Sequence, residues 1–269
     1  MRPASNDIEQ WRHQIEKHSL RRLDRAAERI IEAKRSGKSL VVVTGSGPNL
    51  HEGISTLIAG LIHQGIVDGV ITSSAIIAHE MAGTLDRVHR VHLENPIRFG
   101  IKPDLLPREG GFEISQLSRD QRHSLEKELD INWELYDHLN QLPGDYLIKA
   151  AGNMGWPLGL RTEQIAQEAL KLAVRYKKPL EAIVGHGCDP WTMVGAGSQK
   201  KIPVLVSTPQ MVGGGTVGLA IGDSIPISQR SRLIARLLAK ADVIIESAVA
   251  LAQEIHDGPF ETYTGHGIW

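Results

Sequence analysis

Residues 39–49 read Ser-Leu-Val-Val-Val-Thr-Gly-Ser-Gly-Pro-Asn, and this stretch decides the fold class. The run from Leu40 to Thr44 is apolar and β-branched at nearly every position, which is typical of a parallel strand that is buried on both faces. A glycine-rich turn ends the run, and residues 52–64 continue with helical spacing. The sequence therefore predicts a β-loop-α unit that opens a parallel sheet.

The same unit recurs along the chain. Further strands are predicted at 67–71, 88–92, 146–150, 180–184, 202–207 and 243–246. Helices are predicted between or after them at 75–82, 162–177 with Thr162 as N-cap, 191–198, 229–240 and 247–255. Because strands alternate with helices, we expect one α/β domain over residues 1–269, with a Rossmann-like, doubly wound and mostly parallel sheet.

Two segments lie outside this alternation. Residues 1–38 place apolar side chains at three- and four-residue steps among charges, which predicts an N-terminal helical extension. Residues 94–140 begin rich in Pro and Gly and continue as a polar helical stretch, which predicts an insertion or a lid over one end of the sheet. Trp156 and Trp191 lie in Gly/Pro-rich loops, as lids or as shelves for a planar ligand.

Composition narrows the classes of partner. The 30 Lys and Arg residues nearly cancel the 31 Asp and Glu residues, so no net field attracts nucleic acid and a small-molecule partner is expected. The single cysteine, Cys188, excludes an intrachain disulfide and favours a reducing compartment. No apolar run approaches the roughly 20 residues that span a bilayer. We therefore expect a cytoplasmic protein with no membrane partner.

Several predicted strands end in polar, glycine-rich loops. They are Thr44-Gly45-Ser46-Gly47, Thr72-Ser73-Ser74, Gly152-Asn153-Met154-Gly155, Gly185-His186-Gly187 and Gly213-Gly214-Gly215. Glycine lets the backbone approach a ligand, and free N–H groups at a following helix favour phosphate. The pattern favours a phosphorylated ligand or a dinucleotide over a set of tight turns, with Gly45 and Ser46 among the binding residues. The usual dinucleotide fingerprint is absent, because its third glycine would fall at Leu50.

Candidate chemical groups also lie in these loops. The 12 histidines lack a tight metal-ligand spacing, so no metal is predicted. Cys188 is interpreted as a buried structural thiol, with a nucleophile as the alternative. His186 and Asp189, in a predicted strand-end loop, are candidates for acid/base or anchoring roles. Glu246 ends a predicted buried strand, where it is either an anchor for a cationic substrate or a satisfied strand-end carboxylate.

Taken in order, several motifs resemble the deoxyhypusine synthase family. Asn49-Leu50 resembles its "S-N-L", residues 65–74 with His79-Glu80 resemble its "M-V-D-V-x-V-T-T-A-G-G" and "E-E-D", and residues 201–204 resemble its "N-I-P-V" strand. Residues 241–242 and 252–258 are similar to its "G-A-D-Y" and "A-Q-E-F-D-G". The resemblance covers about two-thirds of the chain and is distant.

This resemblance implies a sheet of the deoxyhypusine synthase type, a homotetramer with NAD at the subunit interfaces, and chemistry on a polyamine. For this chain we expect NAD as the cofactor and a homo-oligomer that is a dimer or a tetramer. The family's NAD contacts would fall on Asn49, Thr72, Ser73, Ser74 and Glu80. The family also forms an imine through a lysine 13 positions before its "A-D" pair. Counting back here reaches Ser228, so the covalent intermediate of that reaction cannot form.

The sequence therefore predicts an NAD-dependent enzyme of a deoxyhypusine synthase-like group, a transferase or lyase acting on a small amine or amino acid, that does not synthesise deoxyhypusine. His186, Asp189 and Glu246 are its candidate catalytic residues. Two alternatives stay open. The chain could be a non-catalytic nucleotide or metabolite-binding protein, or a lyase or hydrolase that uses no nicotinamide.

Overall fold

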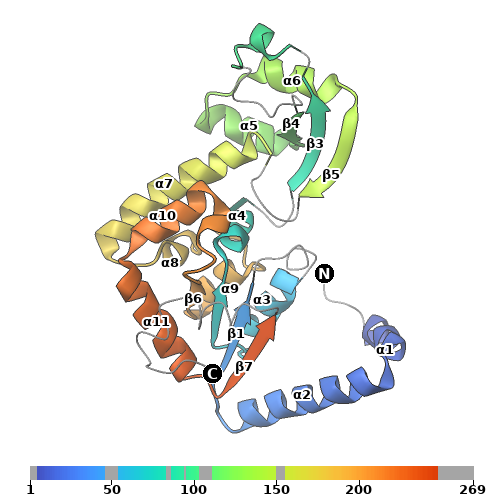
Figure 1. Cartoon of the computed structure of the whole chain (residues 1–269), viewed down its shortest axis with the longest axis vertical. Helices are drawn as coiled ribbons and strands as arrows, with labels where there is room; N and C mark the ends of the chain where they lie inside the picture. The colour runs from blue at the N-terminus through green and yellow to red at the C-terminus, as the bar shows by residue number, and fades with distance from the viewer. Residues whose placement is uncertain are drawn as a thin grey trace.

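The computed structural model describes residues 5–45, 54–82, 86–93, 95–102, 111–149 and 155–247. Figure 1 shows two sheets at different heights, a parallel sheet in the body and a smaller sheet above it. An N-terminal pair of helices extends to one side. The predicted helix at 247–255 and the C-terminal tail lie outside the described residues.

The body contains a four-stranded sheet in which all neighbours are parallel. Its strands are β1 (Leu40–Thr44), β2 (Gly69–Thr72), β6 (Val204–Val206) and β7 (Val243–Ser247), in the order β6-β2-β1-β7. The chain moves outward from β1 to β2 and β6, and then returns to place β7 on the other side of β1. The strand order therefore reverses between β1 and β7. The parallel α/β sheet predicted from the β-branched runs is confirmed.

Helices cover both faces of this sheet, as the alternation along β1 shows. Leu40 and Val42 pack into a core with α3 (Ser55–His63), α4 (Ser74–Ala82) and α9 (Met193–Lys200). Val41 and Val43 face the opposite way, toward α11 (Ile227–Ala239). Both faces of β1 are thus buried, which explains why its sequence is apolar without interruption.

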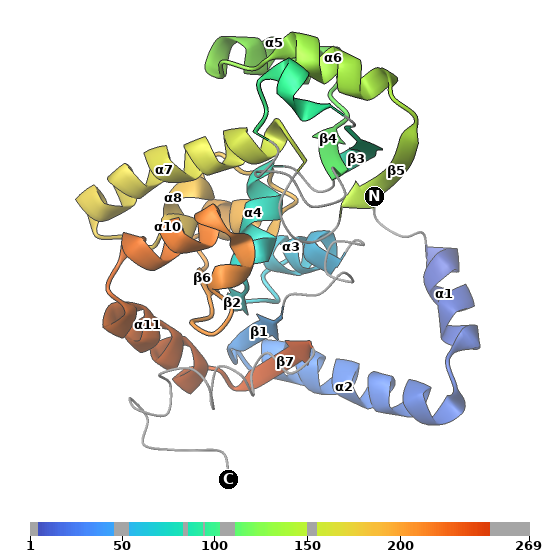
Figure 2. The same cartoon turned by 45° about the horizontal axis from the view of Figure 1, so that its top comes forward.

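A second layer of helices covers α4 and α9. It consists of α7 (Leu158–Tyr176), α8 (Leu180–Val184) and α10 (Thr216–Ser224), with the short 3₁₀ turn η4 (Val212–Gly214) before α10. Figure 2 shows α7 and α10 side by side along this flank. The layer adds to the larger core, where Ala166, Ala169 and Ala173 of α7 are buried.

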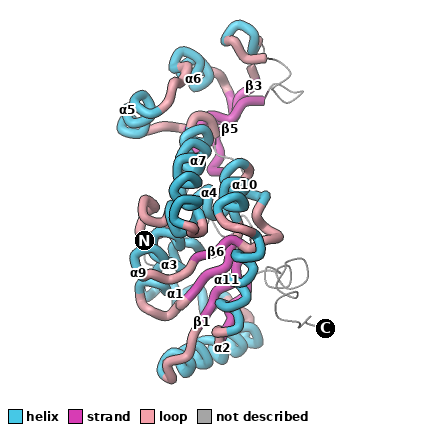
Figure 3. The backbone as a smooth tube through the Cα atoms, turned by 90° about the vertical axis from the view of Figure 1, so that its left-hand side faces the viewer, coloured by secondary structure: helices cyan, strands magenta, loops and turns pink. Residues whose placement is uncertain are grey.

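The smaller sheet is antiparallel and has the order β4-β3-β5. Its strands are β3 (Asp86–His92), β4 (Gly111–Ser115) and β5 (Gly144–Lys149), accompanied by η2 (Pro96–Phe99), α5 (Arg119–Glu128) and α6 (Trp133–Gln141). Figure 3 shows β3 and β5 well away from the parallel strands. The expectation that 88–92 and 146–150 alternate into the parallel sheet is therefore wrong. An apolar pattern indicates that a segment is a strand, but it does not determine which other strand the segment pairs with.

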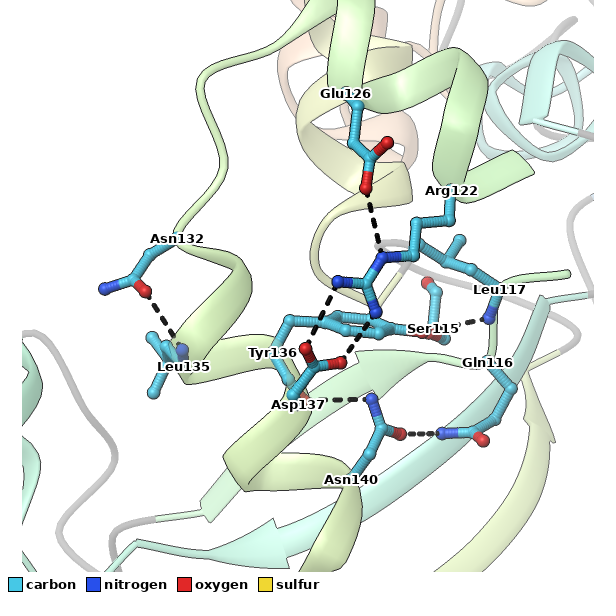
Figure 4. Close-up of polar contacts among 10 residues, drawn as sticks. All are labelled: Ser115, Gln116, Leu117, Arg122, Glu126, Asn132, Leu135, Tyr136, Asp137 and Asn140. Carbon is cyan, nitrogen blue, oxygen red and sulfur yellow. Dashed lines mark hydrogen bonds and ion pairs between the residues drawn. The ribbon is translucent and has the colours of Figure 1, made fainter. Parts of the chain in front are cut away.

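The insertion is wider in the structure than residues 94–140, because β3 and β5 flank it and pair with each other. Trp156 packs on its core against Phe112, and its backbone bonds to β4 on both sides. Arg122 of α5 binds Asp137 of α6 at 2.7 Å and so joins the two helices, and it binds Glu126 of its own helix at 3.2 Å (Figure 4). Its guanidinium also lies over the Trp133 ring. This unit is held by its own core and its own polar network.

The predicted strand at 180–184 is wrong, since these residues form helix α8. Five residues are too few for periodicity to separate a strand from a helix, and Pro179 directly precedes them as the N-cap of the helix. Thr162 is likewise not an N-cap. It lies inside α7, where its hydroxyl donates to the Leu158 carbonyl at 2.9 Å.

The N-terminal extension consists of α1 (Ser5–Gln14) and α2 (Lys17–Arg35), which Figures 1 and 2 show projecting from the body. Arg12 of α1 pairs with Asp24 of α2 at 2.8 Å. Lys34, at the end of α2, pairs with Asp68 at 2.7 Å and attaches the helix to the start of the sheet. In the part of the chain that the structure describes, none of the helices is long and apolar enough to cross a membrane.

Candidate functional site

Two threonines end neighbouring strands at the carboxyl edge of the parallel sheet. The register pairs Val43 of β1 with Ile71 of β2, so Thr44 and Thr72 follow in adjacent positions. Both are completely buried, and neither Oγ1 atom has a hydrogen-bond partner in the structure. A buried hydroxyl without a partner carries a desolvation cost, so this pair is unusual in a protein interior. The edge also contains the reversal of strand order, where ligands bind in open α/β sheets.

Thr72 was among the predicted cofactor-binding residues, and that role stays a prediction. Thr44 appeared in the sequence only as the last residue of its strand. The available signal was that both strands end in a threonine after an apolar run. Gly45, also predicted, is buried directly after Thr44. Ser46 and Asn49 lie outside the described residues.

Ser73 and Ser74 have structural partners instead. Ser73 Oγ accepts a hydrogen bond from Ile76 N at 3.4 Å, in the first turn of α4. Ser74 Oγ donates to the Gln210 carbonyl at 3.0 Å and accepts from Gly214 N at 2.8 Å. Ser74 therefore fastens the start of α4 to the glycine-rich loop after β6, whereas Ser73 bonds within the first turn of α4. Their predicted role in cofactor binding stays a prediction.

Glu80 is buried, and its carboxylate accepts hydrogen bonds from the first backbone N–H groups of helix α9. Its two carboxylate oxygens accept hydrogen bonds from Met193 N at 3.0 Å and Val194 N at 2.9 Å, and Ser55 Oγ donates to it as well. Burial raises the pKa of the Glu80 carboxyl, although these three hydrogen bonds act in the opposite direction. The carboxylate thus joins α3, α4 and α9. The resemblance assigned it to NAD, an assignment that stays a prediction.

His186 and Asp189 do not lie at a strand end, because the segment before them is helix α8. His186 is exposed and its Nδ1 lies 3.1 Å from Ser198 Oγ. Asp189 is exposed and accepts from Trp191 N at 2.7 Å, in a turn whose Trp191 ring packs on His63 at the last turn of α3. The structure therefore does not bring either residue to Thr44 and Thr72.

Glu246 lies near the end of β7, opposite Val43 in the register. Its side chain is exposed, so the premise that it is a buried strand carboxylate is wrong. The premise failed because β7 is an edge strand of the described sheet, and the face that carries Glu246 and Ile244 is open. Since Val43 and Thr44 point to opposite faces, Glu246 and the threonine pair do as well. The catalytic roles proposed for His186, Asp189 and Glu246 stay predictions.

Cys188 is a structural thiol in its protonated form. It is largely buried, and burial together with the charges of Glu80 and Asp189 raises its pKa to about 12. A thiol with this pKa is not a nucleophile near neutral pH. Among the described residues, no group of three or more His, Cys, Asp or Glu side chains could hold a metal ion.

A buried ion pair beside β6 escaped the sequence analysis. Glu181 of α8 and Arg230 of α11 are both completely buried, and their nearest atoms lie 2.5 Å apart. Glu181 also accepts from Val206 N at 2.7 Å, while Arg230 donates to the Val206 carbonyl at 3.3 Å. The pair satisfies the outward backbone groups of an edge strand. The two partners lie 49 positions apart in the sequence, so the pair left no local signal.

Neither position that could correspond to the family's lysine carries one. Ser228, reached by counting, is exposed in the first turn of α11. Alignment on the glycine run 213–215 would place the lysine at Gly218 instead. A Cβ atom there would lie 2.0 Å from the Met211 carbonyl oxygen and 3.0 Å from Ser74 Oγ, so a side chain at this position would displace the Met211 backbone.

Comparison with known proteins yields a distant relationship. No protein-family model matches the chain. Over 140 residues the chain is 30% identical to a probable deoxyhypusine synthase from Methanopyrus kandleri, a match that spans 51% of this chain and 46% of that protein. The chain thus covers about half the length of this relative, in agreement with a distant relationship to the family named from the motifs.

Two solved structures match the chain at low similarity. They are the arginine dihydrolase ArgZ from cyanobacteria, without ligand, and a variant of AgrE in complex with L-arginine. Each is 13% identical with a TM-score of 0.45. The match covers 92% of this chain and 26% of ArgZ, and 96% of this chain and 27% of AgrE.

Proposed function

We propose that this chain is an NAD-dependent enzyme with a Rossmann-like, doubly wound sheet, related to the deoxyhypusine synthases, and that it acts on a small amine or amino acid. The observation that carries the proposal is the pair of buried hydroxyls without partners, Thr44 and Thr72, at the carboxyl edge of the sheet. A bound ligand with ribose hydroxyls or phosphate oxygens supplies the hydrogen bonds that the protein leaves open.

The strand order supports the same position. The strand order reverses between β1 and β7, and dinucleotides bind outside the carboxyl ends of the strands at such a reversal in doubly wound sheets. Gly45 follows β1 without a side chain, so the backbone there can approach a pyrophosphate closely. Thr44, Thr72 and Gly45 would hold the cofactor, and NAD would supply a hydride acceptor.

The proposal excludes deoxyhypusine synthesis itself. That reaction needs an amine at the position of the family's lysine, and this chain has Ser228 or Gly218 there. Gly218 cannot be replaced by a lysine without displacing the Met211 backbone. We therefore propose chemistry on a free amine or amino acid, with no covalent link between the substrate and the protein.

Native mass spectrometry of the freshly purified full chain tests the proposal. One dinucleotide per chain is expected, and NAD at about 100 times its Kd should stabilise the fold by about 2.7 kcal/mol, or roughly 5–10 °C in Tm. ATP at the same concentration is the control and should shift the Tm less. A protein that carries no dinucleotide, and whose Tm neither NAD nor NADH changes, contradicts the proposal. NAD binding without turnover of any amine supports the non-catalytic alternative.

A further inference from the structure

A groove with basic side chains runs beside the amino-terminal part of β6. It has a volume of about 580 Å³ and is lined by residues of α8, α9, β6 and α11, which Figure 1 shows around one edge of the sheet. Its lining includes Val204 and Leu205 but neither Thr44 nor Thr72. This groove, here named the β6 groove, is therefore separate from the candidate cofactor site at the carboxyl ends of β1 and β2.

The free charges that line the β6 groove are all positive. Exposed cations reach it from the ends of α7, α9 and α11, namely Lys178, Lys201, Arg236 and Lys240. None of these four side chains has an ion-pair partner among the residues that the structure describes. The carboxylate in the lining, Glu181, is already bound to Arg230. The groove thus contains positive charge that the described part of the fold does not neutralise.

The groove along α7 differs in this respect. It has a volume of about 540 Å³ and also contains charged residues. There Glu128 pairs with Arg161 at 2.9 Å, and Glu168 pairs with Lys171 at 2.8 Å. Its charges are of both signs and are paired, so an excess of free cations distinguishes the β6 groove.

The rest of the lining of the β6 groove is mostly apolar and lies deeper than the cations. Val204 and Leu205 are buried, and Leu233 and Leu237 of α11 are half-buried. A ligand in the groove therefore meets apolar side chains at one end and cations at the other. This combination suits a molecule with an apolar body and an acidic group.

The edge of β6 restricts the occupant to a small molecule. The register with β2 turns the backbone groups of Val204 and Val206 outward. Those of Val206 are already bound by Glu181 and Arg230, so an added peptide strand cannot pair along β6. A volume of about 580 Å³ is of the size that small-molecule sites have.

We propose that the β6 groove binds a small molecule that has an apolar body and an acidic group, a carboxylate or a phosphate. The apolar body lies against β6 and α11, and the acidic group lies among the four cations. Arg236 can donate two parallel hydrogen bonds to such a group, and the lysines act as point charges. The ligand is a different molecule from the proposed NAD and occupies a different place.

Fluorescence titration of the full chain with 1-anilinonaphthalene-8-sulfonate tests the proposal. In this probe the naphthalene and phenyl rings are the apolar body, and the sulfonate stands in for the carboxylate or phosphate. Wild type is expected to bind the probe saturably, and NAD should not displace it. N-phenyl-1-naphthylamine has the same rings without the sulfonate, and wild type should bind it about tenfold more weakly or less.

Lys201 allows one cation to be removed without disturbing the fold. It ends α9 with a φ of 57°, a conformation that glycine adopts readily, so Lys201→Gly should not lower stability. The substitution should raise the Kd of the sulfonate probe about fivefold. Lys177→Gly is the matched control, because Lys177 ends α7 with a φ of 53° and does not line the groove. This control should leave the Kd unchanged.

A charge reversal on α11 should have a larger effect. Arg236→Glu should raise the Kd of the sulfonate probe about tenfold or more, because an attraction is replaced by a repulsion. Arg232→Glu, at an exposed arginine of the same helix outside the lining, should leave the Kd unchanged. Displacement of the probe by phenyl phosphate or by phenylacetate supports the proposal and identifies the preferred acidic group.

Several results would overturn the proposal. Equal affinity for the two probes, or a Kd that Lys201→Gly and Arg236→Glu leave unchanged, contradicts a role for the cations in binding. Displacement by NAD places the probe in the candidate cofactor site, and displacement by neither phenyl phosphate nor phenylacetate excludes the acidic ligand. Lower stability of both variants in urea, with an unchanged Kd, assigns the cations to the ends of their helices. Since NAD binding is measured separately, either proposal can fail without the other.

Discussion

The edge strand β6 and the carboxyl ends of β1 and β2 belong to one sheet, yet their polar groups are satisfied in different ways. At β6, Glu181 accepts from Val206 N and Arg230 donates to the Val206 carbonyl, so an ion pair takes the place of a missing strand. At the ends of β1 and β2, Thr44 and Thr72 are as deeply buried and have no partner.

This contrast distinguishes buried groups that stabilise the fold from buried groups that are available to a ligand. A group that the chain satisfies internally costs stability when it is removed, because its partner is left buried and unpaired. A buried group without a partner lowers stability, and a ligand that pairs with it in the folded protein would offset that cost. Substitutions at the ion pair should therefore lower the free energy of unfolding, whereas substitutions at the threonine pair should change ligand affinity and leave the free energy of unfolding nearly unchanged.

The largest effect is expected at the ion pair. Arg230→Ala leaves the Glu181 carboxylate buried without its cation and should lower the free energy of unfolding by about 3–5 kcal/mol. Urea titration of both proteins measures the difference. Arg232→Ala, at an exposed arginine of the same helix, is the control and should change it by less than about 0.5 kcal/mol. Equal effects of the two substitutions would show that Arg230 is not a structural residue.

A smaller loss of stability is expected at Gly218, where α10 packs against the loop after β6, the loop to which Ser74 is hydrogen-bonded. Gly218→Ala places a methyl group against the Met211 carbonyl oxygen and should destabilise the fold by about 1–3 kcal/mol. Gly222→Ala lies in the same helix, but its new methyl group meets the flexible Met211 side chain. That variant should stay within about 1 kcal/mol of wild type in thermal unfolding. Equal losses of stability in Gly218→Ala and Gly222→Ala would contradict the close contact between Gly218 and the Met211 backbone.

Glu80 is intermediate between the fully paired Glu181 and the unpaired threonines. Backbone N–H groups of α9 and the Ser55 hydroxyl donate hydrogen bonds to its carboxylate. Burial raises its folded pKa above the ordinary value of 4.5, so the folded protein holds the proton more tightly than the unfolded chain. The stability of wild type should therefore fall as the pH rises from 4.5 until the carboxyl ionises, by about 1.4 kcal/mol for each unit of pKa difference.

Glu80→Gln removes this titration. The stability of the variant relative to wild type should then increase with pH above 4.5, as measured by denaturant unfolding at several pH values. A difference that does not change with pH would show that Glu80 is not held in this environment.

The sequence predicted the parts of the fold that depend on local pattern. The apolar run of β1 and the helical spacing of α11 are both confirmed, the latter at Ile227–Ala239 against a predicted 229–240. Pairing across the chain was beyond the sequence. Strands β3 and β5 pair in a separate sheet, which their local sequence did not indicate. The local sequence of α8 also gave no sign that Glu181 pairs with Arg230, a residue far along the chain.

The same limit applies to the candidate site. Threonine at the end of two strands is visible in the sequence, but whether a hydroxyl finds a partner depends on every element packed around it. Glu80 shows this limit as well, because its hydrogen bonds to the start of α9 join residues 113 and 114 positions apart and left no signal in the sequence. Residues whose partners come from distant segments were assigned least well.

At the threonine pair, the expected effect on stability is close to zero. Valine has nearly the shape of threonine, so Thr44→Val with Thr72→Val removes two unpaired hydroxyls without leaving a cavity. The free energy of unfolding should stay equal or rise slightly. A loss above about 1 kcal/mol in urea titration would show that the hydroxyls are satisfied in the folded protein.

The central claim is that these two hydroxyls are retained for a dinucleotide. Calorimetric titration of NAD into wild type and into the Thr44→Val, Thr72→Val variant tests it most directly. We predict that wild type binds NAD and that the Kd of the variant is about tenfold higher or more, since two ligand hydrogen bonds are lost. Equal NAD affinity in the two proteins, or no NAD binding by wild type, would contradict the account.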